Sequence, residues 1–313
     1  MRKEKLLVIV GPTAVGKSKV AIILAKSING EIISADSMQV YKDMDIGTAK
    51  PNLGDRVQIK HHLIDIVDLK EDFSVAEYQR MAREVITQIH KKGKLPILVG
   101  GSGLYIRAVI DKLEFPWGMM KSPIRRELEK LVESEGLERL YRELQNSDPQ
   151  AAKKIHPHDA RRIIRALEVI KLTGRSFSEY HKEWGKRESI YNVKIIGLNL
   201  PREELQANID RRVDEMMEKG LLKELKELVL KGYKEALTSS QALGYKELLD
   251  YLEGKSSLQG TVKRIKQRTR QFAKRQLTWF RRDPRIKWMD VSGKSVEEIA
   301  SEILDILREE EFI

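Results

Sequence analysis

The sequence predicts an α/β fold, in which a parallel sheet is flanked by helices and interrupted by a mainly helical insertion domain. Two observations predict the sheet. Short apolar runs alternate with helical patterns through the first hundred residues, and the first run leads into a glycine-rich loop. Such alternation is typical of βαβ units, which form parallel sheets. A third observation predicts the insertion, because residues 116–188 are rich in charge and contain no run that resembles a strand.

The length of 313 residues is enough for about two domains. We expect residues 1–115 and 189–313 to form the α/β core with C-terminal helices, and residues 116–188 to form a helical insertion domain. Apolar residues in the insertion recur at helical spacing. The two series are Ile124, Leu128, Leu131 and Ile163, Leu167, Ile170.

Each core strand is expected at a short apolar run, with a helix after most of them. Helices are expected from near Lys17, over residues 75–90 and after the glycines that follow residue 100. After Pro201 a long amphipathic helix is expected, with a break near Gly220. The expected strands are 6–10, 31–35, 62–68, 96–100 and 193–200.

Composition and charge limit the classes of function. The absence of cysteine excludes disulfides, cysteine-ligated zinc and thiol catalysis. No apolar run approaches the ~20 residues that span a bilayer, and the run 6–10 is too short for the core of a signal peptide, so we expect a cytoplasmic enzyme. Residues 261–287 hold eleven lysines or arginines against one aspartate, which is nearly all of the net charge of +11. This concentration predicts a polyanionic partner at one place.

Residues 11–18 read GPTAVGKS, which fits G-x-x-x-x-G-K-[ST] between an apolar strand and a helix. Backbone N–H groups of such a loop face an anion, Lys17 adds positive charge, and the Ser18 hydroxyl can ligate Mg²⁺. The core is therefore expected to be P-loop NTPase-like. The expected phosphate-binding residues are Gly11, Pro12, Thr13, Ala14, Val15, Gly16, Lys17 and Ser18.

The machinery for splitting a nucleoside triphosphate is not evident. P-loop NTPases hold Mg²⁺ with a second acidic residue at the end of another strand. The best candidate strand, 96–100, continues into Gly101 and Ser102 without a carboxylate. Asp65 is an alternative, but it lies in the middle of a run, where it faces solvent or pairs locally. The motif thus predicts phosphate binding and leaves NTP hydrolysis open.

Polar residues follow two further strand ends. Asp36 and Ser37 come after the run 31–35, and GGSG at 100–103 places Ser102 after the run 96–100. Ligands of open α/β sheets bind at this edge, where Asp36 could accept a proton from a second substrate. A helix cap explains Asp36 equally well, and a tight turn explains the glycines. Convergence of three such ends on one cleft favours a site.

These stretches resemble the bacterial tRNA dimethylallyltransferases (tRNA isopentenyltransferases). The matching segments are GPTAVGKS, ISADSMQVYKDMDIGTAKP, HHLIDI, LVGGSGLYIRA, IHPHDARRIIRALEV, QALGYKE and KRQLTWFRR, in the family's order between Gly11 and Arg282. The resemblance implies transfer of a dimethylallyl group from dimethylallyl diphosphate to N6 of the adenosine immediately 3′ of the anticodon in tRNA, releasing diphosphate. It also implies that the phosphate loop holds this diphosphate rather than ATP, which accounts for the missing acidic residue.

The resemblance also implies roles for individual residues. Asp36 falls on the general base and Arg212 on an arginine that faces the diphosphate, while Ser102 stands where the family often has Thr. The implied catalytic residues are Lys17, Asp36, Ser102 and Arg212. The implied tRNA contacts are Asp36, Ser37, Met38, Gln39, Ser102, Arg125, Arg161, Arg162, Arg165, Gln241, Gly244 and Lys246. The implied cofactor is Mg²⁺ at Ser18, and the implied partners are dimethylallyl diphosphate and the tRNA anticodon stem-loop, with no membrane and no obligate protein partner.

The basic stretch 261–282 has two helical faces. Ile265, Phe272 and Trp279 recur at a spacing of seven, and we expect them to be buried rather than to stack on unpaired bases. Arg264 and Arg268, with Gln271 and Arg275, form a basic stripe on another face. Such a stripe is either a solvated face or a phosphate-contacting one. Because this stripe is almost purely basic, we expect Arg264 and Arg268 to contact the RNA backbone.

Other interpretations remain open at this point. A small-molecule kinase would use the phosphate loop and Asp36 but leaves the basic stretch unexplained. A non-catalytic RNA-binding protein that senses nucleotide gives Asp36 no role. An adenylate isopentenyltransferase would need neither the insertion nor the basic stretch. His61 and His62 are expected to pack or to form hydrogen bonds rather than to bind a metal.

Overall fold

The computed structural model describes residues 3–115 and 122–313. They form two compact units, one of residues up to Ile110 together with Ile190–Ile313, and one of Asp111–Ser189. The expected insertion, 116–188, falls in the second unit, except that its first six residues, 116–121, lie outside the described residues.

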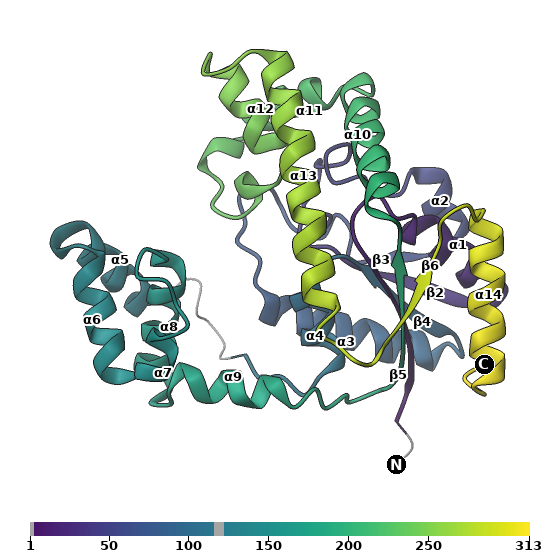
Figure 1. The fold of residues 1–313 in the computed structure, drawn as a ribbon, viewed down its shortest axis with the longest axis horizontal. Coiled ribbons are helices and arrows are strands. Elements are labelled where there is room, and N and C mark those ends of the chain that lie inside the picture. Colours follow the sequence, from purple (N-terminus) through teal and green to yellow (C-terminus); the bar gives the residue numbers. More distant parts are fainter. Residues whose placement is uncertain (1–2, 116–121) are drawn as a thin grey trace. The chain divides into compact units, whose positions relative to one another are not determined.

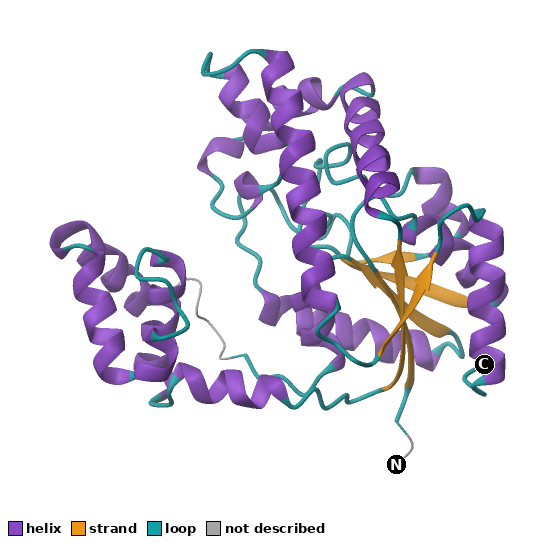
Figure 2. Ribbon diagram, in the orientation of Figure 1, coloured by secondary structure: helices purple, strands orange, loops and turns teal. Residues whose placement is uncertain are grey.

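A parallel sheet forms the centre of the first unit (Figure 2). Among the described residues it has six strands in the order β3-β2-β4-β1-β5-β6, and every neighbouring pair runs parallel. The predicted parallel α/β architecture is confirmed. The strands are β1 (Lys5–Val10), β2 (Gly30–Ala35), β3 (His61–His62), β4 (Leu95–Gly100), β5 (Asn192–Asn199) and β6 (Ile286–Asp290).

Two strands differ from the prediction. The expected strand 62–68 is wrong beyond its first residue, because Leu63 and Asp65 have φ values of 61° and 57°, in the left-handed region that breaks an extended chain. Among the residues that the structure describes, an isolated bridge between Tyr41 and Val67 alone continues the pairing. Strand β6 was not predicted, since it lies at the sheet edge and mixes buried and charged residues.

Helices cover both faces of the sheet (Figure 1). Alternation along β1 shows this directly, because Leu6 and Val8 pack with α3 and α4 while Leu7 and Ile9 pack with α1 and α14. Successive side chains of a strand point to opposite faces, so a fully apolar run is buried on both. These helices are α1 (Lys17–Ser27), α3 (Val75–Lys91), α4 (Gly103–Ile110) and α14 (Val296–Glu309).

Among the described residues this unit holds five further helices. The expected break near Gly220 is confirmed, because this glycine, at φ 95°, ends one helix and begins the next. No helix among the described residues is both long and apolar enough to cross a membrane. The helices are α2 (Leu53–Gln58), α10 (Arg202–Glu218), α11 (Leu221–Leu230), α12 (Tyr245–Leu252) and α13 (Leu258–Phe280), with 3₁₀ turns at Tyr233–Glu235 and Ser239–Gln241.

The second unit consists of helices around its own apolar core. Both predicted helical series contribute to that core, which confirms the spacing. The helices are α5 (Pro123–Glu135), α6 (Leu137–Ser147), α7 (Pro149–Ala152), α8 (Ala160–Thr173) and α9 (Phe177–Gly185).

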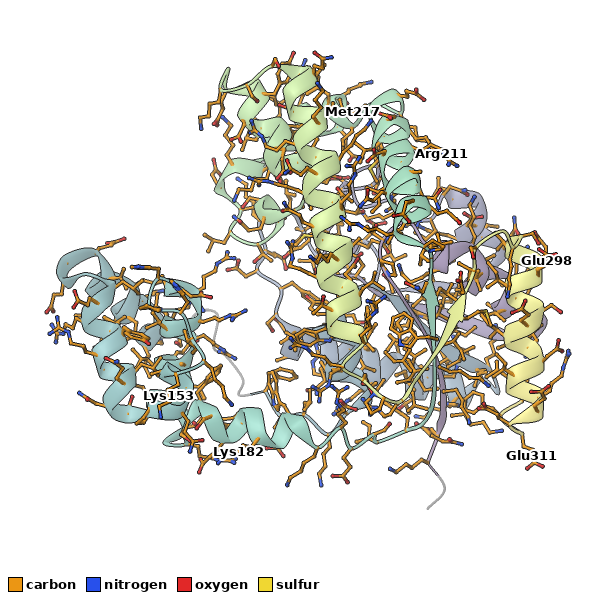
Figure 3. The ribbon with its side chains drawn as sticks, viewed as in Figure 1. Lys153, Lys182, Arg211, Met217, Glu298 and Glu311 are labelled. Atoms are coloured by element: carbon orange, nitrogen blue, oxygen red, sulfur yellow. The ribbon has the colours of Figure 1, made fainter. Side chains whose placement is uncertain are left out.

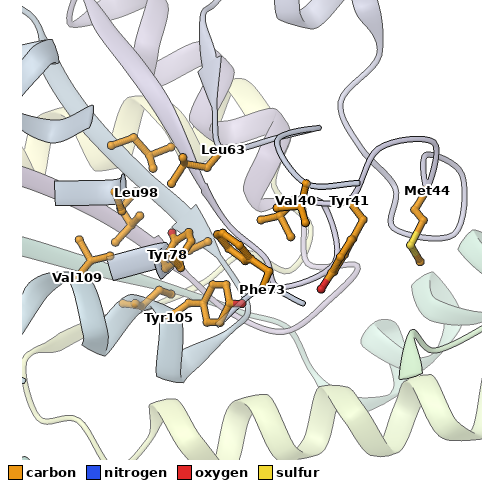
Figure 4. Packing of buried hydrophobic residues seen from close by; sticks show 14 of the residues in the cluster. Val40, Tyr41, Met44, Leu63, Phe73, Tyr78, Leu98, Tyr105 and Val109 are labelled. Carbon is orange, nitrogen blue, oxygen red and sulfur yellow. The ribbon is translucent and has the colours of Figure 1, made fainter. Parts of the chain in front are cut away.

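An aromatic cluster supports the end of β2 (Figure 4). Tyr78 and Tyr105 stack with their ring centroids 4.2 Å apart, and the Tyr78 hydroxyl donates to the Ser34 carbonyl at 2.9 Å. Burial, with the nearby charge of Asp36, raises the pKa of Tyr78 well above its usual value. The cluster therefore holds the strand end just before Asp36 with neutral, rigid side chains.

Candidate active site

The phosphate loop follows β1 and leads into α1. Gly11 passes close to β5, since a Cβ at this position would lie 2.5 Å from the Leu198 carbonyl oxygen. Gly16, just before the first turn of α1, has a φ of 97°, which only glycine adopts readily. The loop thus brings its backbone to the N-terminal end of a helix, where N–H groups without intrahelical partners favour an anion.

Two cations lie at this loop. The Lys17 ammonium donates to the Pro12 carbonyl at 2.6 Å. Burial and, after it, the charge of Arg212 lower the pKa of Lys17, and Asp36 opposes both effects, so that the pKa lies at about 7. Burial also lowers the pKa of Arg212, again opposed by Asp36. Two neighbouring desolvated cations are unfavourable unless an anion joins them, so the arrangement suits a diphosphate.

Asp36 stands in a turn at the end of β2. Its Oδ1 accepts from the backbone N–H groups of Met38 at 2.8 Å and Gln39 at 3.3 Å. The helix-cap interpretation is wrong, because residues 37–40 form a turn and no helix begins there. The hydrogen bonds fix the position of the carboxylate, while its second oxygen accepts no hydrogen bond from any described residue.

Ser102 joins the ends of β2 and β4. Its hydroxyl oxygen accepts from the Ser37 N–H at 3.3 Å, and its own N–H donates to the Ala35 carbonyl at 3.3 Å. An oxygen that accepts from a backbone N–H can still donate its hydroxyl proton elsewhere. Ser102 therefore offers a donor directly beside Asp36.

Asp36, Ser102 and Arg212 line one cavity of about 320 Å³. Three segments far apart in the sequence thus converge at the carboxyl edge of the sheet. Thr13 of the phosphate loop also lines this cavity. Its apolar wall includes Met38, Ile209, Val213, Met216, Leu221 and Leu243.

A second cavity, of about 510 Å³, lies against the other side of the phosphate loop. Its lining includes Lys17, Ser18 and Arg211, and Arg212 lines both cavities. Helix α10 therefore supplies side chains to both cavities, and its Arg211 is labelled in Figure 3.

The other expected tRNA contacts of the first unit surround the 320 Å³ cavity. Met38, Gln241 and Gly244 line it, and the Lys246 ammonium donates to Gln241 Oε1 at 3.3 Å. Gln39 is engaged internally, since its Oε1 accepts from Ser34 and its Nε2 donates to the carbonyls of Thr48 and Ala49. Its side chain thus holds the loop at Thr48 and Ala49 in place.

Helix α13 departs from the prediction on one face. Ile265 is buried, but Phe272 is 37% exposed and Trp279 42% exposed, so the expected burial of these two aromatics is wrong. The buried face instead passes through Ala273, Gln276 and Phe280. Phe272 lines the cavity, together with Arg275.

The basic stripe of α13 is paired with acidic residues of α12. Arg268 Nη1 lies 2.7 Å from a Glu247 carboxylate oxygen, and Arg264 Nη1 lies 3.3 Å from one of Asp250. About half of the Arg268 side chain is exposed. These guanidinium groups keep exposed donors while the ion pairs hold their positions.

The four expected arginines of the second unit lie on α5 and α8. Arg165 and Arg125 both approach the buried Glu168 carboxylate, at 3.0 Å and 3.7 Å. Arg162 lies 3.3 Å from Asp159, and Arg161 is exposed. Three of the four are thus held by acidic partners.

Sequence reasoning missed two residues that support the site. Glu224 of α11 accepts from the N–H groups of Asp45, Ile46 and Gly47, and Gly47 lines the 320 Å³ cavity. Gln276 contacts the phosphate loop. Neither contact has a local signal, because each joins segments more than 170 residues apart.

The donor set for a metal is small. Asp65 pairs with Lys50 and Arg56, which confirms the local pairing considered for it. His61 and His62 bond to the Ile59 carbonyl and to Glu31, as expected. Among the described residues no cluster of three acidic or histidine side chains could hold a metal. Ser18 is exposed at the start of α1, and one hydroxyl fits Mg²⁺ when phosphate oxygens supply most of its ligands.

The chain is similar to known proteins over nearly its whole length. The family model described as IPP transferase matches residues 39–283. The tRNA dimethylallyltransferase of Carboxydothermus hydrogenoformans is 52% identical over 301 residues, and that of Halalkalibacterium halodurans is 47% identical, each match covering 96% of both chains. The crystal structure of the tRNA isopentenylpyrophosphate transferase from Bacillus halodurans is similar with a TM-score of 0.72, at 47% identity and 98% coverage of both chains. A eukaryotic dimethylallyltransferase acting on tRNA gives a TM-score of 0.84 at 33% identity, over 98% of this chain and 80% of that one.

Proposed function

The chain belongs to the IPP transferase family, and we propose that it transfers a dimethylallyl group from dimethylallyl diphosphate to N6 of the adenosine immediately 3′ of the anticodon in tRNA. It is thus an enzyme, a prenyltransferase of tRNA. The observation that carries the proposed reaction is the single cavity lined by Asp36, Ser102 and Arg212 beside a phosphate loop. This cavity supports the proposal because a carboxylate and an arginine line it together with Thr13 of the phosphate loop.

The diphosphate binds at the phosphate loop, Gly11 to Ser18. Loop N–H groups, Lys17 and Arg212 face it, and its charge joins the two desolvated cations. Negative charge grows on the diphosphate as it leaves the allylic carbon. Fixed donors and cations around a leaving group lower the barrier because they need no reorganisation during the reaction.

Asp36 acts on the amine. The N6 lone pair is delocalised into the adenine ring, so N6 is a weak nucleophile until its proton can leave. As the N6–C1 bond forms, the C1–O bond to the diphosphate breaks, and the N6 proton passes to the Asp36 carboxylate. The backbone N–H groups of Met38 and Gln39 hold that carboxylate in place. The Ser102 hydroxyl, in the same cavity, helps to position the Asp36 carboxylate as general base.

The apolar wall of the cavity suits the isoprenyl chain. Met38, Val213 and Leu221 offer hydrocarbon surface around a volume of about 320 Å³. Burial of the reacting carbon among such side chains keeps water away from a developing allylic cation. The target base would have to leave its stack to enter this cavity.

The cofactor of the proposed reaction is Mg²⁺. Ser18 would hold it together with oxygens of the bound diphosphate. When bound, it would neutralise part of the charge that the leaving diphosphate gains.

The tRNA anticodon stem-loop is the proposed second substrate, and its contacts come from both units. Asp36, Ser37, Met38, Gln39, Ser102, Gln241, Gly244 and Lys246 are proposed to contact the loop near the target base. Arg264 and Arg268 are proposed to contact the backbone, as are Arg125, Arg161, Arg162 and Arg165 of the second unit. Several of these arginines already have acidic partners. Each of those therefore adds to the affinity for tRNA only the difference between its interaction with a phosphate and its interaction with its present carboxylate.

The alternatives explain less of the molecule. A kinase that uses ATP would need an acidic residue at a strand end, and Asp65 is committed to Lys50 and Arg56. A non-catalytic RNA-binding protein leaves the buried cations and Asp36 without a role. An adenylate isopentenyltransferase would not need the basic face of α13.

Two transcripts of one tRNA test the proposed target. The first carries adenosine immediately 3′ of the anticodon and the second carries guanosine there. Incubation with Mg²⁺ and dimethylallyl diphosphate, followed by nucleoside mass spectrometry, is expected to show prenylated adenosine in the first transcript alone. Equal prenylation of both transcripts would contradict the proposed target.

A further inference from the structure

Gln276 of α13 joins two loops of the proposed active site through one buried amide. Its Oε1 accepts from the Thr13 N–H at 2.9 Å, and its Nε2 donates to the Gly101 carbonyl at 3.1 Å. The side chain is 7% exposed. A backbone N–H can only donate and a carbonyl can only accept, so the amide has one orientation that satisfies both partners.

Gly101 and Gly103 leave room for two side chains of α13. A Cβ on Gly101 would lie 2.1 Å from Gln276 Nε2, and a Cβ on Gly103 would lie 2.1 Å from Trp279 Cδ1. Neither glycine has a positive φ. Their role is therefore to admit the side chains of α13 rather than to form a turn that other residues cannot adopt.

The two loops carry different halves of the proposed reaction. Thr13 belongs to the loop that faces the diphosphate, and Gly101 precedes Ser102, which lies beside Asp36. Between them, the Gln276 amide spans the gap with one hydrogen bond to each side.

We propose that Gln276 is a positioning residue, which holds the phosphate loop and the Ser102 loop at the separation that aligns the allylic carbon with the N6 of adenosine. This inference rests on the proposed function. Without the amide each loop loses a hydrogen-bond partner, and the position of the diphosphate relative to the Asp36 carboxylate is no longer fixed. A misplacement of reacting groups by about 1 Å can lower a rate by about 10²-fold.

Gln276→Leu removes both hydrogen bonds and keeps a similar volume. We expect kcat to fall by roughly ten- to a hundredfold, the affinity for dimethylallyl diphosphate measured without tRNA to fall, and the affinity for tRNA to stay unchanged. Gln267→Leu is the matched control, because Gln267 is an exposed glutamine of the same helix outside the cavity. It is expected to leave kcat and the diphosphate affinity as in the wild-type protein.

Gln276→Glu gives a readout that mere structural support would not move. A neutral carboxylic acid can accept from Thr13 and donate to Gly101 as the amide does, whereas a carboxylate cannot donate. The kcat of this variant, divided by that of the wild type at the same pH, is therefore expected to rise as pH falls. A flat ratio across the pH range would overturn the proposal.

Gly101→Ala approaches the same contact from the other side and serves if Gln276→Leu does not fold. Its Cβ would displace the amide, so its effect on kcat is expected to be far from additive with that of Gln276→Ala in the double variant. Additive effects would overturn the proposal, as would a Gln276→Leu protein with a lowered melting temperature but wild-type kcat and diphosphate affinity.

The diphosphate titration also separates this inference from the proposed function. A wild-type protein that fails to prenylate tRNA would refute the function. The comparison of diphosphate affinity between wild type, Gln276→Leu and Gln267→Leu would still decide whether Gln276 positions the loop.

Discussion

Lys17 and Arg212 line the same cavity at the phosphate loop, and burial, followed by the charge of Arg212, lowers the pKa of Lys17 to about 7. A bound diphosphate favours the charged form of Lys17 and raises this pKa. Binding and protonation of Lys17 are therefore linked.

The first prediction is a pH dependence of diphosphate binding. Below pH 7 Lys17 is already protonated and this contribution to affinity is complete. Above pH 7 the free protein must take up a proton in order to bind, so the affinity is expected to fall by up to about tenfold per pH unit until the pKa of the bound state is reached. Titration calorimetry with dimethylallyl diphosphate, without tRNA, measures this dependence.

Lys17→Arg is the control for that prediction, because arginine stays protonated throughout this range. The fall above pH 7 is expected to disappear in this variant. A wild-type affinity that stays constant from pH 7 to 9 would contradict the linkage.

The second prediction concerns Asp36. In Asp36→Asn the side-chain oxygen can still accept from the Met38 and Gln39 N–H groups, but the group no longer takes up a proton. The single-turnover rate of transfer is expected to fall by about 10²-fold or more, while tRNA affinity stays nearly intact because Asp36 is one of many proposed contacts. Asp36→Ala, which also loses the turn, is expected to be at least as slow. A fully active Asp36→Asn protein would remove Asp36 as the base.

The third prediction concerns the loop that Glu224 supports. Glu224→Ala leaves the N–H groups of Asp45, Ile46 and Gly47 without their acceptor. We expect the free energy of unfolding to fall by about 2–3 kcal/mol and kcat to fall as well, since Gly47 and Thr48 line the cavity. Urea denaturation measures the first effect. Glu227→Ala, an exposed glutamate on the same helix, is the control that should change neither.

The fourth prediction concerns the basic face of α13. Replacing Arg264 and Arg268 by Gln is expected to weaken tRNA binding and to lower the slope of log affinity against log salt by about one for each phosphate that the variant no longer neutralises. Glutamine avoids placing new negative charge beside Glu247 and Asp250. Filter binding at several salt concentrations gives the slope. Arg308→Gln, which replaces an exposed arginine paired with Asp305, is the control. A slope in the Arg264 and Arg268 variant equal to that of the wild-type protein would show that this face does not contact the RNA backbone.

Much of the fold could be predicted because its strands are buried on both faces. The run at β1 is apolar throughout, and so is the run at β4. The run 62–68 also predicts a strand, but the extended backbone ends at Leu63 and Asp65. The hydrophobic pattern does not reveal the left-handed conformations of these two residues. Strand β6 lies at the sheet edge, where burial is partial and the pattern is weak.

The candidate site, like the fold, could be predicted from the sequence only in part. Asp36 and Ser102 could be found because strand ends of a parallel sheet share one edge. The contact of Gln276 with Thr13 could not, because it spans 263 residues of sequence. A spacing of seven placed Phe272 on one helical face, but the side that is buried depends on what packs there.

The central claim is that the loop from Gly11 to Ser18 binds an isoprenoid diphosphate that reacts with tRNA. The most direct measurement is one incubation of the protein with unmodified tRNA, Mg²⁺, ATP and dimethylallyl diphosphate labelled in the isoprenyl group, followed for label in tRNA and for ATP consumed. The account predicts label in tRNA adenosine, in an amount equal to the diphosphate released, with ATP unchanged. Consumption of ATP with unlabelled tRNA would contradict it.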